Sequence, residues 1–156
     1  MITYKELVQN CLSTVKEILP WDLEARLAEN PNLLILDVRE PYEFEKMHIR
    51  NSINVPRGVV ESACEWNYEE TVPVLVQARS QEIIVVCRSG FRSVLVAFQM
   101  QLMGYKNVVS LKSGLRGWND YEQPLQNQHG EIVSIESADA YFFPTLRLEQ
   151  KRPHMQ

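Results

Sequence analysis

The chain has 156 residues, of which 45% are hydrophobic and 23% are charged. This composition is typical of an ordinary globular domain and excludes a wholly disordered chain, which would be poorer in apolar residues. No apolar run approaches the ~18 residues of a membrane-spanning helix. The formal net charge of -4 argues against general binding to nucleic acids or anionic membranes, because phosphate groups are bound by clustered cations.

The first 30 residues predict two helices. Thr3 and Glu6 have the spacing of a capping box, in which each side chain bonds to the other residue's backbone N–H. Apolar residues at helical spacing then predict an amphipathic helix over about residues 4–16, which Pro20 ends. A second, short helix is expected over about residues 23–29.

Strands alternate with helices over the rest of the chain as far as Pro124. Apolar, β-prone runs predict buried strands at 33–38, 53–56, 82–87 and 107–111. Helices are expected between and after them, at 42–47, in two pieces over 57–79, at 91–103 and after 113–118. Such alternation indicates βαβ units and a mostly parallel sheet. After Pro124 the pattern fades, although apolar residues over 132–143 predict that part of the segment packs.

The cysteines are too few, and of odd number, for a disulfide framework: Cys11, Cys64 and Cys87. The N-terminus shows no basic segment followed by an apolar one, so we expect no signal peptide and a cytoplasmic protein with reduced thiols. Neither the cysteines nor the three histidines have the spacing of metal ligands, and no glycine-rich nucleotide fingerprint occurs. We therefore expect neither a metal nor a cofactor.

The strongest strand leads directly into Cys87. A cysteine at the carboxyl end of a parallel strand lies where open α/β sheets place their ligands. Free backbone N–H groups and the positive end of the next helix point toward it. Arg88 and Arg92 add positive charge, so the segment favours a thiolate, which is the nucleophilic form of cysteine. The same N–H groups would stabilise an anion beside the sulfur.

Other residues of this segment support a reactive cysteine. Gly90 allows a backbone position that a Cβ would obstruct, and Ser89 and Ser93 can donate further hydrogen bonds. A lone cysteine after a buried strand is more often a small core residue. The two arginines, the glycine and the strand–loop–helix context favour the reactive interpretation for Cys87.

Three segments resemble the signatures of the rhodanese family. Residues 34–44 together with 47–56 resemble its N-terminal signature, residues 87–93 its active-site loop, and residues 109–118 its C-terminal signature. The motifs stand in the family's order, and the resemblance covers about residues 18–125. It implies a rhodanese-like α/β domain with a central, mostly parallel five-stranded sheet flanked by helices on both faces.

The same resemblance implies a division of the chain. Residues 18–125 would form the rhodanese domain. Residues 1–17 would be an N-terminal helical extension, and residues 126–156 a partly packed C-terminal extension.

The resemblance also implies a sulfurtransferase. Cys87 would take a sulfane sulfur from thiosulfate or a similar donor, hold it as a persulfide, and pass it to a thiophilic acceptor such as cyanide or a thiol. A protein could also be the acceptor. The backbone amides from Arg88 to Arg92, through Ser89, Gly90 and Phe91, would bind the terminal sulfur. Arg88 would bind the anionic donor, and Arg92 would brace the loop.

Asp37 and Arg39 lie within the first motif, at the end of its buried strand and on the same edge of the sheet as Cys87. The family makes them supports for the loop, together with Ser93, through charge-assisted hydrogen bonds. A purely local ion pair between Asp37 and Arg39 explains the same two residues equally well. His48 and Trp118 are expected to be structural.

Two alternatives to the sulfurtransferase remain open. The extra terminal segments fit a non-catalytic or sulfur-carrier module that binds a protein partner. A phosphatase or arsenate reductase is a weaker alternative, because Cys87 to Arg92 spans six residues. Related phosphatases and arsenate reductases have a loop one residue longer, which holds a tetrahedral oxyanion. The sequence also leaves open whether Cys64 resolves a persulfide or disulfide on Cys87.

Overall fold

Five short strands form the central sheet of the computed structural model, which describes residues 1–153. They are β1 (Lys16–Ile18), β2 (Leu34–Asp37), β3 (Ile53–Asn54), β4 (Glu82–Val86) and β5 (Asn107–Leu111). All neighbouring strands are parallel, in the order β1-β5-β4-β2-β3. Parallel pairing is possible because a crossover joins each strand to the next. The predicted fold class is confirmed.

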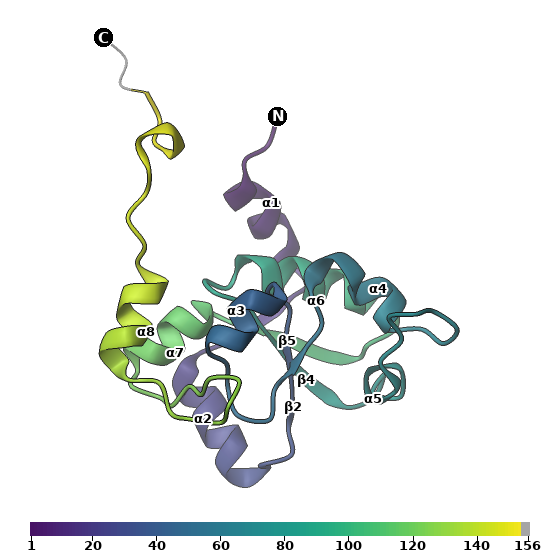
Figure 1. The fold of residues 1–156 in the computed structure, drawn as a ribbon. Coiled ribbons are helices and arrows are strands. Elements are labelled where there is room, and N and C mark those ends of the chain that lie inside the picture. Colours follow the sequence, from purple (N-terminus) through teal and green to yellow (C-terminus); the bar gives the residue numbers. More distant parts are fainter. Residues whose placement is uncertain (154–156) are drawn as a thin grey trace.

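Helices cover both faces of this sheet (Figure 1). They are α1 (Tyr4–Cys11), α2 (Pro20–Glu29), α3 (Pro41–Lys46), α4 (Val60–Ala63), α5 (Pro73–Val76), α6 (Phe91–Leu102), α7 (Gly114–Asp120) and α8 (Ile135–Phe142). Two 3₁₀ turns lie at Arg57–Val59 and Leu148–Gln150. No helix within residues 1–153 is long and apolar enough to cross a membrane.

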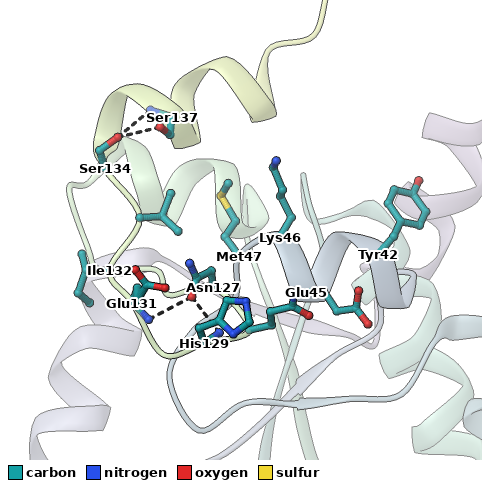
Figure 2. A pocket seen from close by; sticks show the side chains of 12 residues that line it. Tyr42, Glu45, Lys46, Met47, Asn127, His129, Glu131, Ile132, Ser134 and Ser137 are labelled. Carbon is teal, nitrogen blue, oxygen red and sulfur yellow. Dashed lines mark hydrogen bonds between the residues drawn. The ribbon is translucent and has the colours of Figure 1, made fainter.

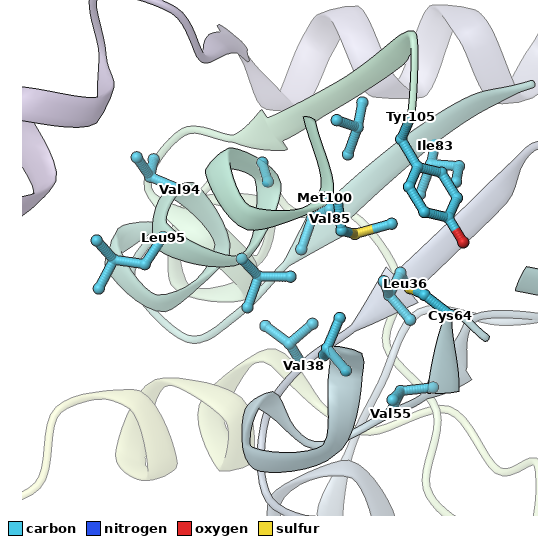
Figure 3. Packing of buried hydrophobic residues seen from close by; sticks show 14 of the residues in the cluster. Leu36, Val38, Val55, Cys64, Ile83, Val85, Val94, Leu95, Met100 and Tyr105 are labelled. Carbon is cyan, nitrogen blue, oxygen red and sulfur yellow. The ribbon is translucent and has the colours of Figure 1, made fainter. Parts of the chain in front are cut away.

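Alternating side chains of the strands divide the core into two halves. Leu36 and Val85 face one way and pack with α1, α4, α5 and α6. Ile84 and Val86 face the other way and pack with α2, α7 and α8. Figure 3 shows the first half, in which side chains from β2 and β4 meet Met100 of α6. Burial on both faces explains why the central strands are almost entirely apolar.

The prediction of one helix over residues 4–16 was wrong. The capping box of Thr3 and Glu6 is present, but α1 ends at Cys11, and β1 follows at the edge of the sheet. Val15 and Ile18 are buried, as the helical pattern implied, but they reach the core from the turn and from β1. A three-residue strand is too short to show a period of its own, so its apolar positions continued the helical stripe.

Both terminal segments pack against the sheet domain. Val8 and Cys11 of α1 belong to the core half that includes α6. Ala138 and Phe142 of α8 belong to the other half, together with Trp118 of α7. The partial packing predicted for the C-terminal segment is therefore α8 against α7. The division of the chain at residues 17 and 125 stays a prediction.

Candidate active site

Cys87 follows β4 directly, and the loop into α6 folds around its sulfur. The Gly90 N–H donates to Cys87 Sγ at 3.1 Å, and the Ser93 N–H donates at 3.3 Å. The cysteine is only 1% exposed. Burial disfavours a charge on the sulfur, and the two backbone N–H donors aimed at it offset that cost because they can hydrogen-bond to an anion. The site can therefore hold a thiolate or a bound anionic sulfur.

A pair of serine hydroxyls extends this environment into the core. Ser93 Oγ lies 3.3 Å from Cys87 Sγ and 2.7 Å from Ser110 Oγ, and both serines are fully buried. When the sulfur is ionised, the Ser93 hydroxyl can donate to it while accepting from Ser110. Sequence reasoning missed Ser110. Its only signal is one polar residue within the otherwise apolar end of β5.

The start of α7 fixes the outer side of the active-site loop. The Leu115 N–H donates to the carbonyl of Cys87 at 2.9 Å, and the Arg116 N–H donates to the carbonyl of Arg88 at 3.0 Å. These carbonyls are thereby turned toward α7. The following N–H groups of the loop are left free to point at the sulfur.

Two glycines make this close approach possible. Gly90 has φ +93°, and a Cβ there would lie 2.9 Å from the Ser113 nitrogen. Gly114 has φ +60°, and a Cβ there would lie 2.5 Å from the Cys87 carbonyl oxygen. Both conformations and both contacts favour glycine over any L-residue with a side chain. The third motif of the sequence thus acts directly on the first residue of the loop.

Glu43 of α3 holds the far end of the loop through Arg92. Arg92 Nη1 and Nη2 donate to the two carboxylate oxygens of Glu43 at 2.8 and 3.0 Å. Burial pushes the pKa of the Glu43 carboxyl upward, but hydrogen bonds from Arg92 and from the Glu40 N–H outweigh it, so the pKa is lowered. The same pair raises the pKa of Arg92. Arg92 is therefore occupied as a brace.

Glu43 was missing from the residues expected at the site. Asp37 and Arg39 were expected instead, and the structure places both side chains in a fully buried ion pair, with Arg39 Nη2 2.9 Å from Asp37 Oδ2. Arg39 Nη2 also donates to the Met47 carbonyl at 2.6 Å. Within residues 1–153, neither side chain hydrogen-bonds to the loop. Instead, they fix the segment that carries Glu43. This agrees with the interpretation of Asp37 and Arg39 as a local ion pair. The only signal for Glu43 was its position three residues after Glu40 at the start of α3.

The remaining side chains of the loop do not bind the sulfur. Arg88 and Phe91 are half-buried and Ser89 is exposed. Within the described chain, their side chains form no hydrogen bond to Cys87 Sγ. Phe91 instead packs edge-on against Tyr4 of α1, with ring centroids 5.2 Å apart. The N-terminal helix therefore contacts the 87–92 loop, which the sequence did not indicate.

Two other candidate residues lie outside the site. His48 stacks on Phe44 at 3.9 Å, and its Nδ1 lies 2.7 Å from the Phe44 carbonyl oxygen, so it is structural, as expected. Cys64 is fully buried beside Tyr105, which precedes the amino end of β5. Because the strands are parallel, this end of the sheet is opposite to the one that carries Cys87. Burial raises the pKa of the Cys64 thiol, so it is poorly suited to resolving a persulfide.

A separate cavity of about 540 Å³ lies between α3 and residues 126–137. Figure 2 shows polar side chains around it, among them Lys46 and Glu45 from α3 and His129 and Asn127 from the segment opposite. No residue of the 87–92 loop lines this cavity. Within the described residues, no cluster of histidine, cysteine and carboxylate side chains could hold a metal ion.

Comparison with known proteins gives this site a family. A model of the rhodanese-like domain matches residues 20–121. The chain belongs to the rhodanese-like family. The family predicted from the three motifs is thereby confirmed, and the matched region includes residues 87–92.

Relatives of this rhodanese-like chain carry names from sulfur chemistry. It is 35% identical over 107 residues to the "Putative sulfur carrier protein YrkF" of Bacillus subtilis, which covers 68% of this chain and 52% of that protein. It is 31% identical over 103 residues to the "Putative thiosulfate sulfurtransferase, mitochondrial" of Schizosaccharomyces pombe, covering 64% and 72%. The chain thus spans about half the length of YrkF.

A similar solved structure comes from Rhodopseudomonas palustris. It is a protein of unknown function described as a possible tyrosine phosphatase, with a TM-score of 0.72 and 25% sequence identity. The similarity covers 81% of this rhodanese-like chain and 96% of that one.

Proposed function

We propose that this rhodanese-like domain transfers a sulfane sulfur from thiosulfate or a similar donor to a thiophilic acceptor through a persulfide on Cys87. The observation that carries the proposal is the pair of backbone N–H groups, from Gly90 and Ser93, aimed at Cys87 Sγ. The names of the relatives support sulfur transfer in general. Thiosulfate as donor, and cyanide, a small thiol or a protein thiol as acceptor, are our proposal.

The reaction consists of two displacements at sulfur. The Cys87 thiolate attacks the outer sulfur of thiosulfate. A new S–S bond forms at Cys87, the S–S bond of the donor breaks, and sulfite leaves with the electron pair. An acceptor thiolate or cyanide then attacks the outer sulfur of the persulfide, and Cys87 leaves as a thiolate. The N–H groups of the loop stabilise the sulfur anion before the first step and after the second.

The electrostatic setting replaces a general base. No histidine hydrogen-bonds to Cys87 within residues 1–153. The negative charge on the Cys87 sulfur is instead balanced by the N–H donors and by the positive charge of Arg92, which interacts with Cys87 electrostatically. A thiolate formed in this way needs no proton acceptor during the attack.

Mass spectrometry of the intact protein tests the proposal. After incubation with thiosulfate and removal of the donor, the wild type is expected to gain the mass of one sulfur atom, which cyanide removes. Cys87→Ser should gain none. Cys11→Ala is the matched control, since Cys11 is the last residue of α1 and its thiol donates to the Leu7 carbonyl, so its loss should leave the gain intact. A sulfur retained in Cys87→Ser would overturn the mechanism.

A sulfur carrier and a binding module give different results in the same experiment. A carrier would gain the sulfur on Cys87 but turn over slowly with free thiosulfate and cyanide, because its acceptor is a protein. A module that only binds a partner would gain no sulfur.

A phosphatase is the second candidate, because the similar structure from Rhodopseudomonas palustris is described as a possible one. The size of the loop argues against it. The loop from Cys87 to Arg92 has six residues, one fewer than the loop that holds a tetrahedral oxyanion in related phosphatases, and Cys87 is only 1% exposed. Hydrolysis of an aryl phosphate that is lost in Cys87→Ser would favour the phosphatase instead.

A further inference from the structure

The N-terminal helix α1 is held firmly against the domain. Val8 and Cys11 are buried in the core half that includes α6. The capping box of Thr3 and Glu6 fixes the first turn, with the Thr3 N–H 2.6 Å from Glu6 Oε2. Gln101 of α6 also donates to the Thr14 carbonyl just after α1. The first residue of the helix therefore has a defined place.

That first residue is Tyr4, which contacts Phe91 of the active-site loop. Its ring meets Phe91 of the loop edge-on, at 5.2 Å and 88°. The phenol is close enough to Cys87, Arg92 and Arg57 to feel the charge of all three. Half of the residue is exposed. Tyr4 thus combines a fixed ring with a hydroxyl that is open to a ligand.

Thiosulfate brings negative charge, which residues near Cys87 must accommodate. When the outer sulfur of thiosulfate approaches Cys87 Sγ, the three oxygen atoms of thiosulfate lie on the side away from Cys87. Arg92 is not free to bind these oxygen atoms, because both of its terminal nitrogens donate to Glu43. Arg57 forms no ion pair within residues 1–153 and is exposed, so it can face an anion. An uncharged hydrogen-bond donor beside Arg57 would complete a binding site for the oxygen atoms of thiosulfate.

We propose that the Tyr4 hydroxyl helps to bind the sulfur-donating substrate. It donates a hydrogen bond to an oxyanion oxygen of that substrate, and Arg57 supplies a positive charge nearby. This inference rests on the proposed function and extends it to a residue that lies outside the matched family region, 20–121. Burial and the charge of Cys87 raise the pKa of Tyr4. The hydroxyl therefore stays protonated at neutral pH and able to donate.

Tyr4→Phe tests the proposal, because it removes the hydroxyl and keeps the ring against Phe91. The KM for thiosulfate is expected to rise about fivefold with little change in kcat, as for the loss of one hydrogen bond made equally in the ground and transition states. Inorganic polysulfide has no oxygen atoms, so its KM should not change. Tyr68→Phe is the matched control, since Tyr68 is equally exposed and lies between α4 and α5. An unchanged KM for thiosulfate, or an equal rise for both donors, would overturn the proposal.

A binding measurement separates this inference from the proposed function. Thiosulfate is titrated by calorimetry into Cys87→Ser, in which no transfer can occur, and into the same protein carrying Tyr4→Phe. Binding is expected to be about fivefold weaker in the double variant. If the wild type gained no sulfur from any donor, the proposed function would fail while this comparison still decided on Tyr4. Equal affinities, or no measurable binding to Cys87→Ser, would overturn the role of Tyr4.

Discussion

Arg92, in the first turn of α6, forms a two-point ion pair with Glu43, which lies 49 residues earlier in α3. The Glu43 side chain is 7% exposed and that of Arg92 27%. Because little water reaches the pair, neither group is easily solvated when the other is removed. The pair ties the active-site loop to α3, whose Glu43 belongs to the first motif.

Glu43→Gln should lower the free energy of unfolding by about 2 kcal/mol, since it leaves a half-buried guanidinium without its charged partner. Urea unfolding followed by circular dichroism measures this difference. Glu149→Gln is the control, because the Arg147–Glu149 pair has the same shortest N···O distance of 2.8 Å, but both side chains are about 70% exposed. Its effect should stay within about 0.5 kcal/mol. Equal losses in the two variants would contradict the role given to Glu43.

The contribution of Glu43 should also depend on pH. Its pKa is lower in the folded protein than in the unfolded chain, where it is about 4.3. The stabilisation is therefore complete well above that value and is lost as the pH falls through the lower, folded pKa. The difference in stability between wild type and Glu43→Gln should thus shrink when unfolding is measured below about pH 4. A difference that grows with acidification would contradict this assignment.

Gly114→Ala should destabilise the fold and slow the loading of sulfur onto Cys87. The new Cβ would meet the Cys87 carbonyl at 2.5 Å, in addition to the unfavourable φ of +60°. We expect a loss of about 2–4 kcal/mol in the free energy of unfolding. Gly130→Ala isolates the effect of φ, since that glycine has φ +77° and open space around it. It should cost about 1 kcal/mol and leave sulfur loading unchanged.

Ser110→Ala should slow persulfide formation while leaving the loop in place. It removes the partner of the Ser93 hydroxyl, which then orients less firmly toward Cys87 Sγ. The expected loss of one neutral hydrogen bond is about 1 kcal/mol, or roughly a fivefold lower rate of sulfur gain in a time course followed by mass spectrometry. Ser137→Ala removes a hydroxyl from the exposed pair with Ser134 and serves as the control. Equal rates in both variants would show that Ser110 has no part in the site.

Patterns that are local in sequence predicted most of the fold. The apolar runs that became β2, β4 and β5 are buried on both faces, and this burial is what their composition reflects. The edge strand β1 was missed because three residues carry no period, and its partner in the sheet, β5, lies about 90 residues away in the chain. Such pairing depends on tertiary contacts that no local pattern records.

The residues of the candidate site also fall into those that a local sequence pattern predicted and those that it did not. The loop from Cys87 to Arg92 was visible because strand, turn and helix follow one another along the chain. Glu43, Ser110 and Tyr4 were not, because each contacts the loop from a different element. A glutamate at a helix start and a serine in a strand are common for other reasons, so their type alone could not assign them to the site.

The clamp that α7 places on the carbonyls of Cys87 and Arg88 has a consequence for how reactivity is encoded. A peptide cut from residues 82–102 would carry every side chain of the loop, yet nothing in it would turn those two carbonyls outward. The reactive sulfur is thus a property of the assembled domain. Its anion-binding geometry is complete before any donor arrives, so binding a donor demands little rearrangement of the backbone.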